Sequence, residues 1–221
     1  MLSIIVSTSV QLPLIAMSSK IRFVFLLVHF LLLFAYGASA ESSSTASERD
    51  RRTARIQAAY LTHLVKFTYW QESHLPEAGE APKIIILGEE GKGFVESLKF
   101  IVGQSALRID DRLVELHHFT NQERVEAEKV IKGGCQVVYL LKNSTFSVPE
   151  IKSLTFQAVV FGEERKFVAE SGGDVSFVTA RNRVKLVVSA KYFRRTSPKL
   201  SSKLANLKSV VEIYPPFGTD S

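Results

Sequence analysis

Two short apolar runs decide the fold of this chain: Lys83-Ile-Ile-Ile-Leu87 and Cys135-Gln-Val-Val-Tyr-Leu-Leu141. Neither run shows the strict alternation of apolar and polar residues that marks a strand with one solvated face. Uninterrupted, β-branched runs of this length are typical of strands that are buried on both faces of a parallel sheet. The two runs therefore predict a sheet that is covered by helices on both sides.

Helix-like and strand-like segments alternate around these two runs. Apolar spacing predicts helices over residues 55–70, 94–102, 122–132 (with Asn121 as N-cap) and 149–154, and strands over 112–119, 157–161, 174–179 and 183–189. A short polar turn, Ala180-Arg-Asn182, joins the last two strands and predicts an antiparallel hairpin. Ser197 and Pro198 are typical of a helix start, and the spacing after them predicts a final helix with an apolar side of Leu200, Leu204, Leu207 and Val211.

The predicted fold class is therefore α/β. We expect a mostly parallel central sheet that is flanked by helices on both faces, with a C-terminal antiparallel hairpin and a final helix.

The N-terminal residues have the pattern of a secretory signal peptide. Lys20 and Arg22 precede a twelve-residue apolar run, Phe23 to Phe34, and Ala38 and Ala40 then form an A-x-A cleavage site. A membrane span needs about 20 residues, so this run favours cleavage near Ala40 and export to the periplasm over an uncleaved N-terminal anchor. Met17 is an alternative start, because the residues before it contain no basic cluster.

The remaining chain divides into three parts. Residues 41–54 are rich in Ser, Thr and Glu and predict a flexible leader, residues 55–214 predict a single α/β domain, and Pro215 begins a tail over residues 215–221. No second apolar run of spanning length follows, so the mature protein is not expected to cross a membrane.

Charge and cysteine content exclude several classes of protein. The chain has 28 Lys and Arg against 22 Asp and Glu, a formal net charge of +6. Cleavage near Ala40 removes Lys20 and Arg22 and no acidic residue, which leaves +4. This excess is smaller than nucleic-acid-binding domains usually carry, so no nucleic-acid partner is expected. One cysteine, Cys135, excludes an internal disulfide framework and a cysteine-rich zinc module.

The loop after the first apolar run contains Gly88, Gly91 and Gly93. Its G-x-x-G-x-G spacing differs from the dinucleotide fingerprint, and no Lys-Ser or Lys-Thr pair follows it as in a P-loop. Glu89 and Glu90 would repel a phosphate. The loop therefore favours a structural turn over a nucleotide site.

Other candidate sites have simpler interpretations. His117 and His118 are adjacent in a predicted strand, so their side chains point to opposite faces and do not readily share a metal ion. Cys135 opens an apolar strand, which favours a buried thiol over a nucleophile or an intermolecular disulfide. No catalytic constellation is recognisable, so the sequence predicts no enzyme activity, no cofactor and no metal.

Two surface features leave alternatives open. The segment Lys191 to Lys208 contains six Lys and Arg, which form either a solvated helix face or a contact with an anionic membrane or an acidic partner. The aromatic residues Tyr60, Phe67, Tyr69 and Trp70 favour a core position, with Trp70 as the alternative partner anchor.

A series of short motifs, in the same order, resembles the YfiR family of secreted regulators. The matching segments are Ala58-Ala-Tyr60 with Lys66-Phe67 and Trp70, Ile85-Ile-Leu-Gly88, Cys135-Gln-Val-Val-Tyr139, Gly172-Gly173, Arg183-Val-Lys-Leu186 and Lys199-Leu-Ser-Ser-Lys-Leu204. The family-motif residues are Tyr60, Lys66, Phe67, Trp70, Gly88, Cys135, Gly172, Gly173, Arg183, Lys199, Ser201, Ser202 and Leu204. The resemblance spans about residues 56–211. Val188-Ser189 replaces the Ile-Asn pair common in the family, and a lone cysteine cannot form the internal disulfides of some members.

The resemblance implies a periplasmic protein that binds the periplasmic sensor domain of an inner-membrane GGDEF-type diguanylate cyclase, represses it and so lowers cyclic-di-GMP. The alternative is a periplasmic sensor of a small ligand or of peptidoglycan that feeds another membrane receptor, with its cleft beside Gly88 to Gly93. A homodimer is compatible with either interpretation.

Overall fold

The computed structural model describes residues 47–180 and 183–216 of the 221-residue chain. The predicted signal peptide over residues 1–40, the first six residues of the predicted leader and most of the tail lie outside this part, so these assignments stay predictions. Residues 47–54 are helical, although their composition predicted a leader. The helix includes them because Ala54 packs into the core at 1% exposure while Arg and Glu, which are good helix formers, face solvent.

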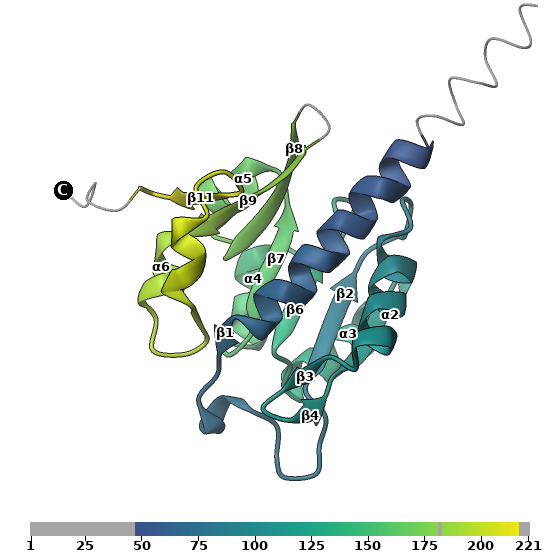
Figure 1. Ribbon diagram of the computed structural model, residues 1–221. Helices are drawn as coiled ribbons and strands as arrows, with labels where there is room; N and C mark the ends of the chain where they lie inside the picture. Colours follow the sequence, from purple (N-terminus) through teal and green to yellow (C-terminus); the bar gives the residue numbers. More distant parts are fainter. Residues whose placement is uncertain (1–46, 181–182, 217–221) are drawn as a thin grey trace, which may run out of the picture. The chain divides into compact units, whose positions relative to one another are not determined.

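A seven-stranded sheet forms the centre of the domain, with the strand order β11-β9-β8-β7-β6-β2-β5 (Figure 1). Its strands are β2 (Lys83–Leu87), β5 (Glu115–Phe119), β6 (Val137–Leu140), β7 (Val159–Glu163), β8 (Val175–Ala180), β9 (Arg183–Ser189) and β11 (Val211–Tyr214). Every neighbouring pair is parallel except β8 and β9, which form an antiparallel hairpin. The predicted α/β class, with its mostly parallel sheet and C-terminal hairpin, is confirmed.

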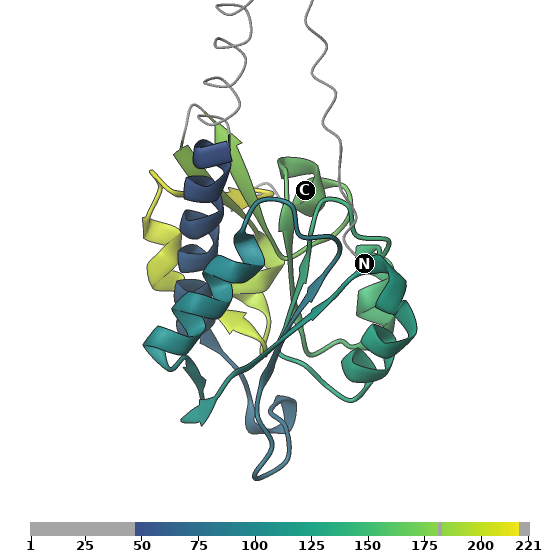
Figure 2. The ribbon, with the colours of Figure 1, turned by 90° about the vertical axis from the view of Figure 1, so that its right-hand side faces the viewer.

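Helices cover both faces of this sheet (Figure 2). The helix over residues 47–66, α2 (Phe94–Ser105) and α6 (Ala190–Arg194) pack on one face, and α3 (Arg124–Lys132), α4 (Val148–Leu154) and α5 (Arg165–Ala169) pack on the other. Short elements connect them: η1 (Glu72–His74), η2 (Asn121–Glu123), η3 (Ser202–Asn206), and the antiparallel pairs β1 (Thr68–Tyr69) with β10 (Lys199–Leu200) and β3 (Arg108–Ile109) with β4 (Arg112–Leu113). Within residues 47–180 and 183–216, no helix has both the length and the apolar character that crossing a bilayer requires.

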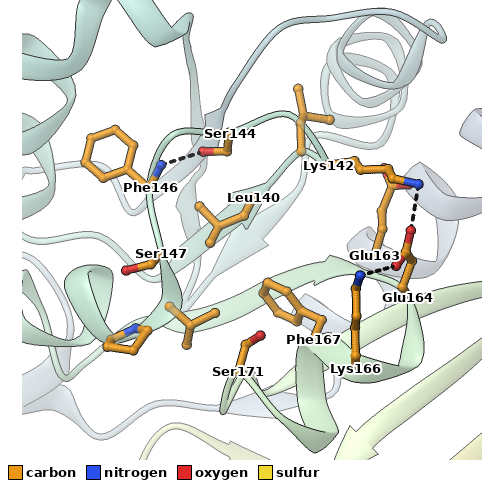
Figure 3. Close-up of a pocket in the computed structure, with 13 residues that line it drawn as sticks. Leu140, Lys142, Ser144, Phe146, Ser147, Glu163, Glu164, Lys166, Phe167 and Ser171 are labelled. Atoms are coloured by element: carbon orange, nitrogen blue, oxygen red, sulfur yellow. Dashed lines mark hydrogen bonds and ion pairs between the residues drawn. The ribbon is translucent and has the colours of Figure 1, made fainter.

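Alternate residues of β2 and β6 pack into two different cores, as their uninterrupted apolar runs predicted. Ile85, Leu87, Val138 and Leu140 face the smaller core, which α3 and α4 cover. Phe167 of α5 packs against this core at the carboxyl end of the sheet (Figure 3).

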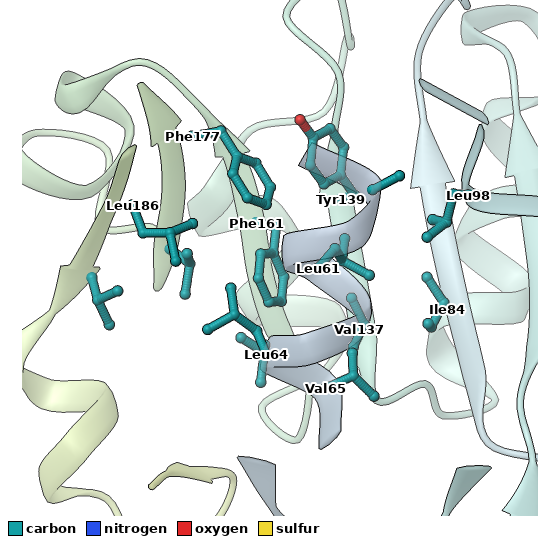
Figure 4. Close-up of a cluster of buried hydrophobic side chains, with 14 of the residues drawn as sticks. Leu61, Leu64, Val65, Ile84, Leu98, Val137, Tyr139, Phe161, Phe177 and Leu186 are labelled. Atoms are coloured by element: carbon teal, nitrogen blue, oxygen red, sulfur yellow. The ribbon is translucent and has the colours of Figure 1, made fainter. Parts of the chain in front are cut away.

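The larger core lies on the opposite face of the same strands. Ile84 and Tyr139 face it, and the helix over residues 47–66 covers it with Leu61 and Leu64 (Figure 4). Tyr139 stacks on Phe94 of α2, with ring centroids 4.3 Å apart. Aromatic stacking of this kind adds about 0.5–1.5 kcal/mol to the stabilisation from burial.

The predicted final helix is wrong. Its residues form β10, the 3-10 turn η3 and β11. Leu200, Leu204 and Val211 are nevertheless buried, at 0%, 8% and 5% exposure, whereas Leu207 is 50% exposed, so the spacing identified three of the four expected core residues. They reach the core from three separate elements, because pairing of β10 with β1 and of β11 with β9 satisfies backbone groups that a helix would otherwise satisfy.

A buried carboxylate, that of Asp174, joins several elements at the turn before β8. The residue is 1% exposed. Its Oδ2 accepts a hydrogen bond from the backbone N–H of Val160 at 2.9 Å, and its Oδ1 accepts from Arg195 and, at 3.3 Å, from Lys152 Nζ. Its backbone carbonyl accepts a hydrogen bond from the N–H of Ser189 at 2.8 Å. Asp174 therefore connects β7, β9, α4 and the segment that leads into β10.

The substitution Asp174→Asn is expected to lower the free energy of unfolding by about 3–5 kcal/mol, because it leaves two partly buried cations without their counter-charge. Urea denaturation at neutral pH measures this change. The matched control is Asp110→Asn, at a carboxylate that is 59% exposed and pairs with Arg112; exposed pairs contribute no more than about 1 kcal/mol. Equal stability losses in the two variants would contradict the assigned role of Asp174.

Candidate partner-binding surface

The structure separates the family-motif residues into a buried group and an exposed group. Trp70, Cys135 and Leu204 are buried, at 7%, 0% and 8% exposure, and Tyr60 is half-buried against the larger core. The burial of Trp70 contradicts its alternative role as a partner anchor. The exposed or half-exposed group consists of Lys66, Phe67, Arg183, Lys199, Ser201 and Ser202.

The motif glycines are required by packing. Gly88 has a φ of 119°, and a Cβ at this position would lie 2.7 Å from Asn143 Oδ1. A Cβ on Gly173 would lie 2.2 Å from the Phe167 ring, and Gly172 has a φ of 78°. These glycines therefore give the backbone freedom and leave room for neighbouring side chains.

The short pair β1 and β10 brings the first and last family motifs together. Thr68 lies opposite Leu200 and Tyr69 lies opposite Lys199, while the backbone N–H of Ser201 donates to the carbonyl of Phe67 at 2.9 Å. Residues about 130 positions apart in the chain thus become direct neighbours.

Alternation along β1 and β10 decides which side chains face solvent. Thr68 and Leu200 point inward: the Thr68 hydroxyl lies 2.6 Å from the Tyr192 hydroxyl, and Leu200 is fully buried. Their neighbours point outward, and Phe67 and Tyr69 are 43% and 60% exposed. We call this surface, made of Phe67, Tyr69, Lys199 and Ser201, the aromatic patch. Exposed aromatic residues of this kind are typical of protein interfaces.

The chain around the aromatic patch is strongly basic. Residues 191–208, which contain β10, include six Lys and Arg and no Asp or Glu. The predicted amphipathic helix over Lys191 to Lys208 does not exist, and Arg195 is used by Asp174. Lys199, Lys203 and Lys208 are exposed. The patch therefore has the charge and the aromatic character that suit an acidic protein partner.

Arg183, Phe67 and Tyr69 occupy positions that the sequence did not predict. Arg183 begins β9 at the hairpin, at the end of the strand farthest from α6, so it does not belong to the aromatic patch (Figure 1). Phe67 and Tyr69 were both expected in the core, and this expectation is wrong because both are exposed. The helix predicted to reach residue 70 ends at residue 66, and β1 has only two residues, too few for periodicity to show which side chain faces solvent.

In the glycine loop after β2, the carboxylate of Glu90 binds backbone N–H groups at the start of α2. Glu90 Oε1 accepts hydrogen bonds from the backbone N–H groups of Lys92, Gly93 and Phe94 at 3.0, 2.7 and 3.1 Å, and Oε2 accepts from Val95 at 2.5 Å. These amides at the start of α2 are the groups that would bind a phosphate. The Glu90 carboxylate occupies them, which supports the structural turn over a nucleotide site.

A second polar network spans the neighbouring strand ends. Helix α2 follows β2 on one face and α4 follows β6 on the other, so β2 and β6 flank the position where α/β proteins often bind ligands. Asn143 Oδ1 accepts from the backbone N–H of Glu89 at 2.9 Å, and Asn121 donates from Nδ2 to the carbonyl of Asn143 at 2.9 Å. Asn121 therefore bridges loops, and the prediction that it caps the next helix is wrong. Thr120 is the residue that precedes η2, and both its N–H and its hydroxyl donate to the Glu123 carboxylate at 2.8 Å.

The two histidines have separate environments. His118 Nε2 lies 2.8 Å from the carbonyl of Gly88, and His117 Nε2 lies 3.5 Å from Glu115. Among the described residues, no group of three or more His, Cys, Asp and Glu side chains is arranged to hold a metal ion.

Replacing Glu90 by Gln is expected to lower the free energy of unfolding by about 1–2 kcal/mol at neutral pH, because charge-assisted bonds to the start of α2 are weakened. Burial raises the pKa of Glu90, but the backbone donors lower it by more, so the net pKa lies below 4.5. The stabilisation is therefore complete above pH 4.5 and is lost as pH falls through the folded-state pKa.

Urea unfolding of both proteins across acidic and neutral pH tests this expectation: the stability difference should shrink as pH falls. The control is Glu96→Gln, at an exposed carboxylate in the first turn of α2. A difference between wild type and Glu90→Gln that does not vary with pH would argue against the carboxylate's role.

The thiol of Cys135 is expected to be unreactive in the folded protein. The residue is fully buried, and burial raises its thiol pKa to about 12. Modification by a disulfide reagent should be at least about 100-fold slower in the native protein than in concentrated guanidinium chloride, because it requires unfolding. Rapid native modification, or a covalent dimer on a non-reducing gel, would overturn this assignment.

Comparison with known proteins places the domain in a family. A search of curated proteins finds no match for the chain. A family model described as YfiR/HmsC-like matches residues 54–208, well over half of the chain. The matched range extends from the helix before β1 through η3 and contains both sides of the β1–β10 pair. The chain belongs to the YfiR/HmsC-like family of periplasmic regulators.

Proposed function

We propose that this protein represses an inner-membrane diguanylate cyclase by binding the periplasmic sensor domain of that enzyme, and so lowers cyclic-di-GMP. Family membership supports the regulatory role and the periplasmic location. Export would follow cleavage of the predicted signal peptide near Ala40. The binding partner is then a GGDEF-type membrane protein, and the protein itself carries out no chemistry.

The aromatic patch is the observation that supports this proposal, and its residues are the ones that we expect to contact the partner. It joins family-motif residues from both ends of the domain, Phe67 with Lys199 and Ser201, on one exposed surface. A surface of exposed aromatic side chains with a basic surround suits a protein partner better than it suits catalysis.

Repression requires only a difference in affinity. A protein that binds the inactive conformer of its partner more tightly than the active conformer shifts the population toward inactivity. A preference of about 100-fold corresponds to about 2.7 kcal/mol, which a few buried aromatic contacts supply.

The alternative, a ligand sensor with its cleft beside Gly88 to Gly93, has less support. The amides of that loop bind Glu90, and Asn121, Asn143 and Glu89 bond to one another at the neighbouring strand ends. A cavity of about 520 Å³ does lie beside this loop, with Arg51, Glu90 and Lys92 in its lining, but Glu90 already binds the amides that a ligand would need.

Deletion of the gene is expected to raise cellular cyclic-di-GMP, because the cyclase is released. Affinity capture with the wild-type protein should recover a membrane protein that contains a GGDEF domain. Unchanged cyclic-di-GMP, together with no cyclase in the captured material, would refute the regulatory proposal.

Matched variants then locate the interface. The double variant Phe67→Ser and Tyr69→Ser should weaken capture by about 30-fold or more, as loss of central aromatic contacts does in other interfaces. Phe100→Ser and Val125→Ser, at apolar side chains that are 68% and 79% exposed elsewhere, should leave capture unchanged. If capture weakens equally in both pairs, or only in the control pair, the aromatic patch is not the interface even if the regulatory role holds.

A further inference from the structure

A cavity of about 440 Å³ opens beside the carboxyl ends of β6 and β7, on the face that carries α4 and α5 (Figure 3). Leu140, Phe146, Val148 and Phe167 provide its apolar lining. Its volume falls in the range of about 300–1,000 Å³ that is typical of small-molecule sites. The cavity shares the loop after β6 with Asn143 of the network between β2 and β6, but it does not include the aromatic patch, so the proposed function does not use it.

Two aromatic walls of the cavity are held in place by their surroundings. A Cβ on Gly162 or Gly173 would lie 2.3 or 2.2 Å from the Phe167 ring, so the ring occupies space that glycine at both positions leaves open. The guanidinium carbon of Arg124 lies 4.2 Å from the centre of the Phe146 ring, a cation–π contact that orients it. A site with preformed walls loses less entropy when a ligand binds.

Three charged side chains stand at the mouth of the cavity. The Glu164 carboxylate lies between two ammonium groups, 2.7 Å from Lys142 Nζ and 3.3 Å from Lys166 Nζ. The two ammonium groups present more N–H donors than one carboxylate accepts, and the three side chains together carry a charge of +1. Glu163 also borders the cavity, and its carboxylate lies near Lys142 (Figure 3). Burial raises the pKa of Glu163, so this carboxyl opposes an anion at the mouth less than an exposed carboxylate would.

Glu164 also has an unusual backbone. Its φ of 67° lies in the left-handed region, although it is not a glycine. Such a conformation costs about 1–3 kcal/mol and persists where the surroundings enforce it, often at binding sites. Here the conformation sets the carboxylate between the two lysines at the start of α5.

We propose that this cavity binds a small aromatic carboxylate, with its ring against Phe146 and Phe167 and its carboxylate directed to Lys142 and Lys166. The apolar lining favours a ring of one or two fused cycles, and the ammonium groups of Lys142 and Lys166 favour an anion over a cation. Glu164 competes with the ligand for the two ammonium groups and therefore limits its affinity.

Naphthoate is a suitable probe, with uncharged naphthylmethanol as its matched analogue. Titration of naphthoate into the purified protein, followed by amide NMR shifts, should move signals from residues 140–148 and 163–171. Naphthylmethanol should bind about tenfold more weakly, because it lacks the charge that pairs with lysine. Shifts confined to the aromatic patch, equal affinities for the two probes, or no saturable shift with naphthoate would each overturn the proposal.

Charge variants at the mouth give effects of opposite sign. Lys142→Met with Lys166→Met should weaken naphthoate binding by about tenfold, whereas Glu164→Gln should tighten it by about threefold, as expected for gains and losses of exposed charge pairs. Lys99→Met with Lys129→Met is the control, at exposed lysines on α2 and α3. All three variants change exposed or half-exposed side chains, so the folded state should persist, and the NMR spectra verify it. Weaker binding in Glu164→Gln, or equal loss in the control, would refute the assigned role of the mouth.

Discussion

The buried carboxylate of Asp174 is the interaction on which the C-terminal half of this domain depends. It bonds to the backbone of β7 and to cations from α4 and from the segment after α6, at the point where the sheet changes from parallel to antiparallel. A charge in this position is stable only while its partners remain in place. The bond to Arg195 therefore fixes the chain just before β10, and β10 in turn places Lys199 and Ser201 beside Phe67.

At the carboxyl edge of the sheet, polar groups that could bind a ligand bind other parts of the chain. Glu90 binds the amides at the start of α2, and Asn121 and Asn143 join the loops beside them. In many α/β proteins these groups hold a ligand; here they stabilise the fold. The two features that we assign to partners are the aromatic patch and the cavity whose charged mouth is centred on Glu164.

The candidate surface could be predicted only in part. The motif pattern selected Phe67, Lys199 and Ser201, and all three meet at the β1–β10 pair. It also selected Gly173 and Cys135, which serve packing, because residues that fit a tight core recur in a motif as readily as residues that bind a partner. Tyr69 was not singled out for the surface, since its exposure depends on a strand partner 130 residues away.

The sequence by itself determined the central strands, because an uninterrupted apolar run such as Lys83-Ile-Ile-Ile-Leu87 is stable only with both faces buried. It also identified Leu200, Leu204 and Val211 as core residues, although it grouped the exposed Leu207 with them. Only the tertiary structure decided that these three residues lie in β10, η3 and β11 and not in one helix. Helical spacing reflects which residues face the core, whereas the choice between helix and strand depends on whether a distant strand, here β1 or β9, offers its backbone hydrogen bonds.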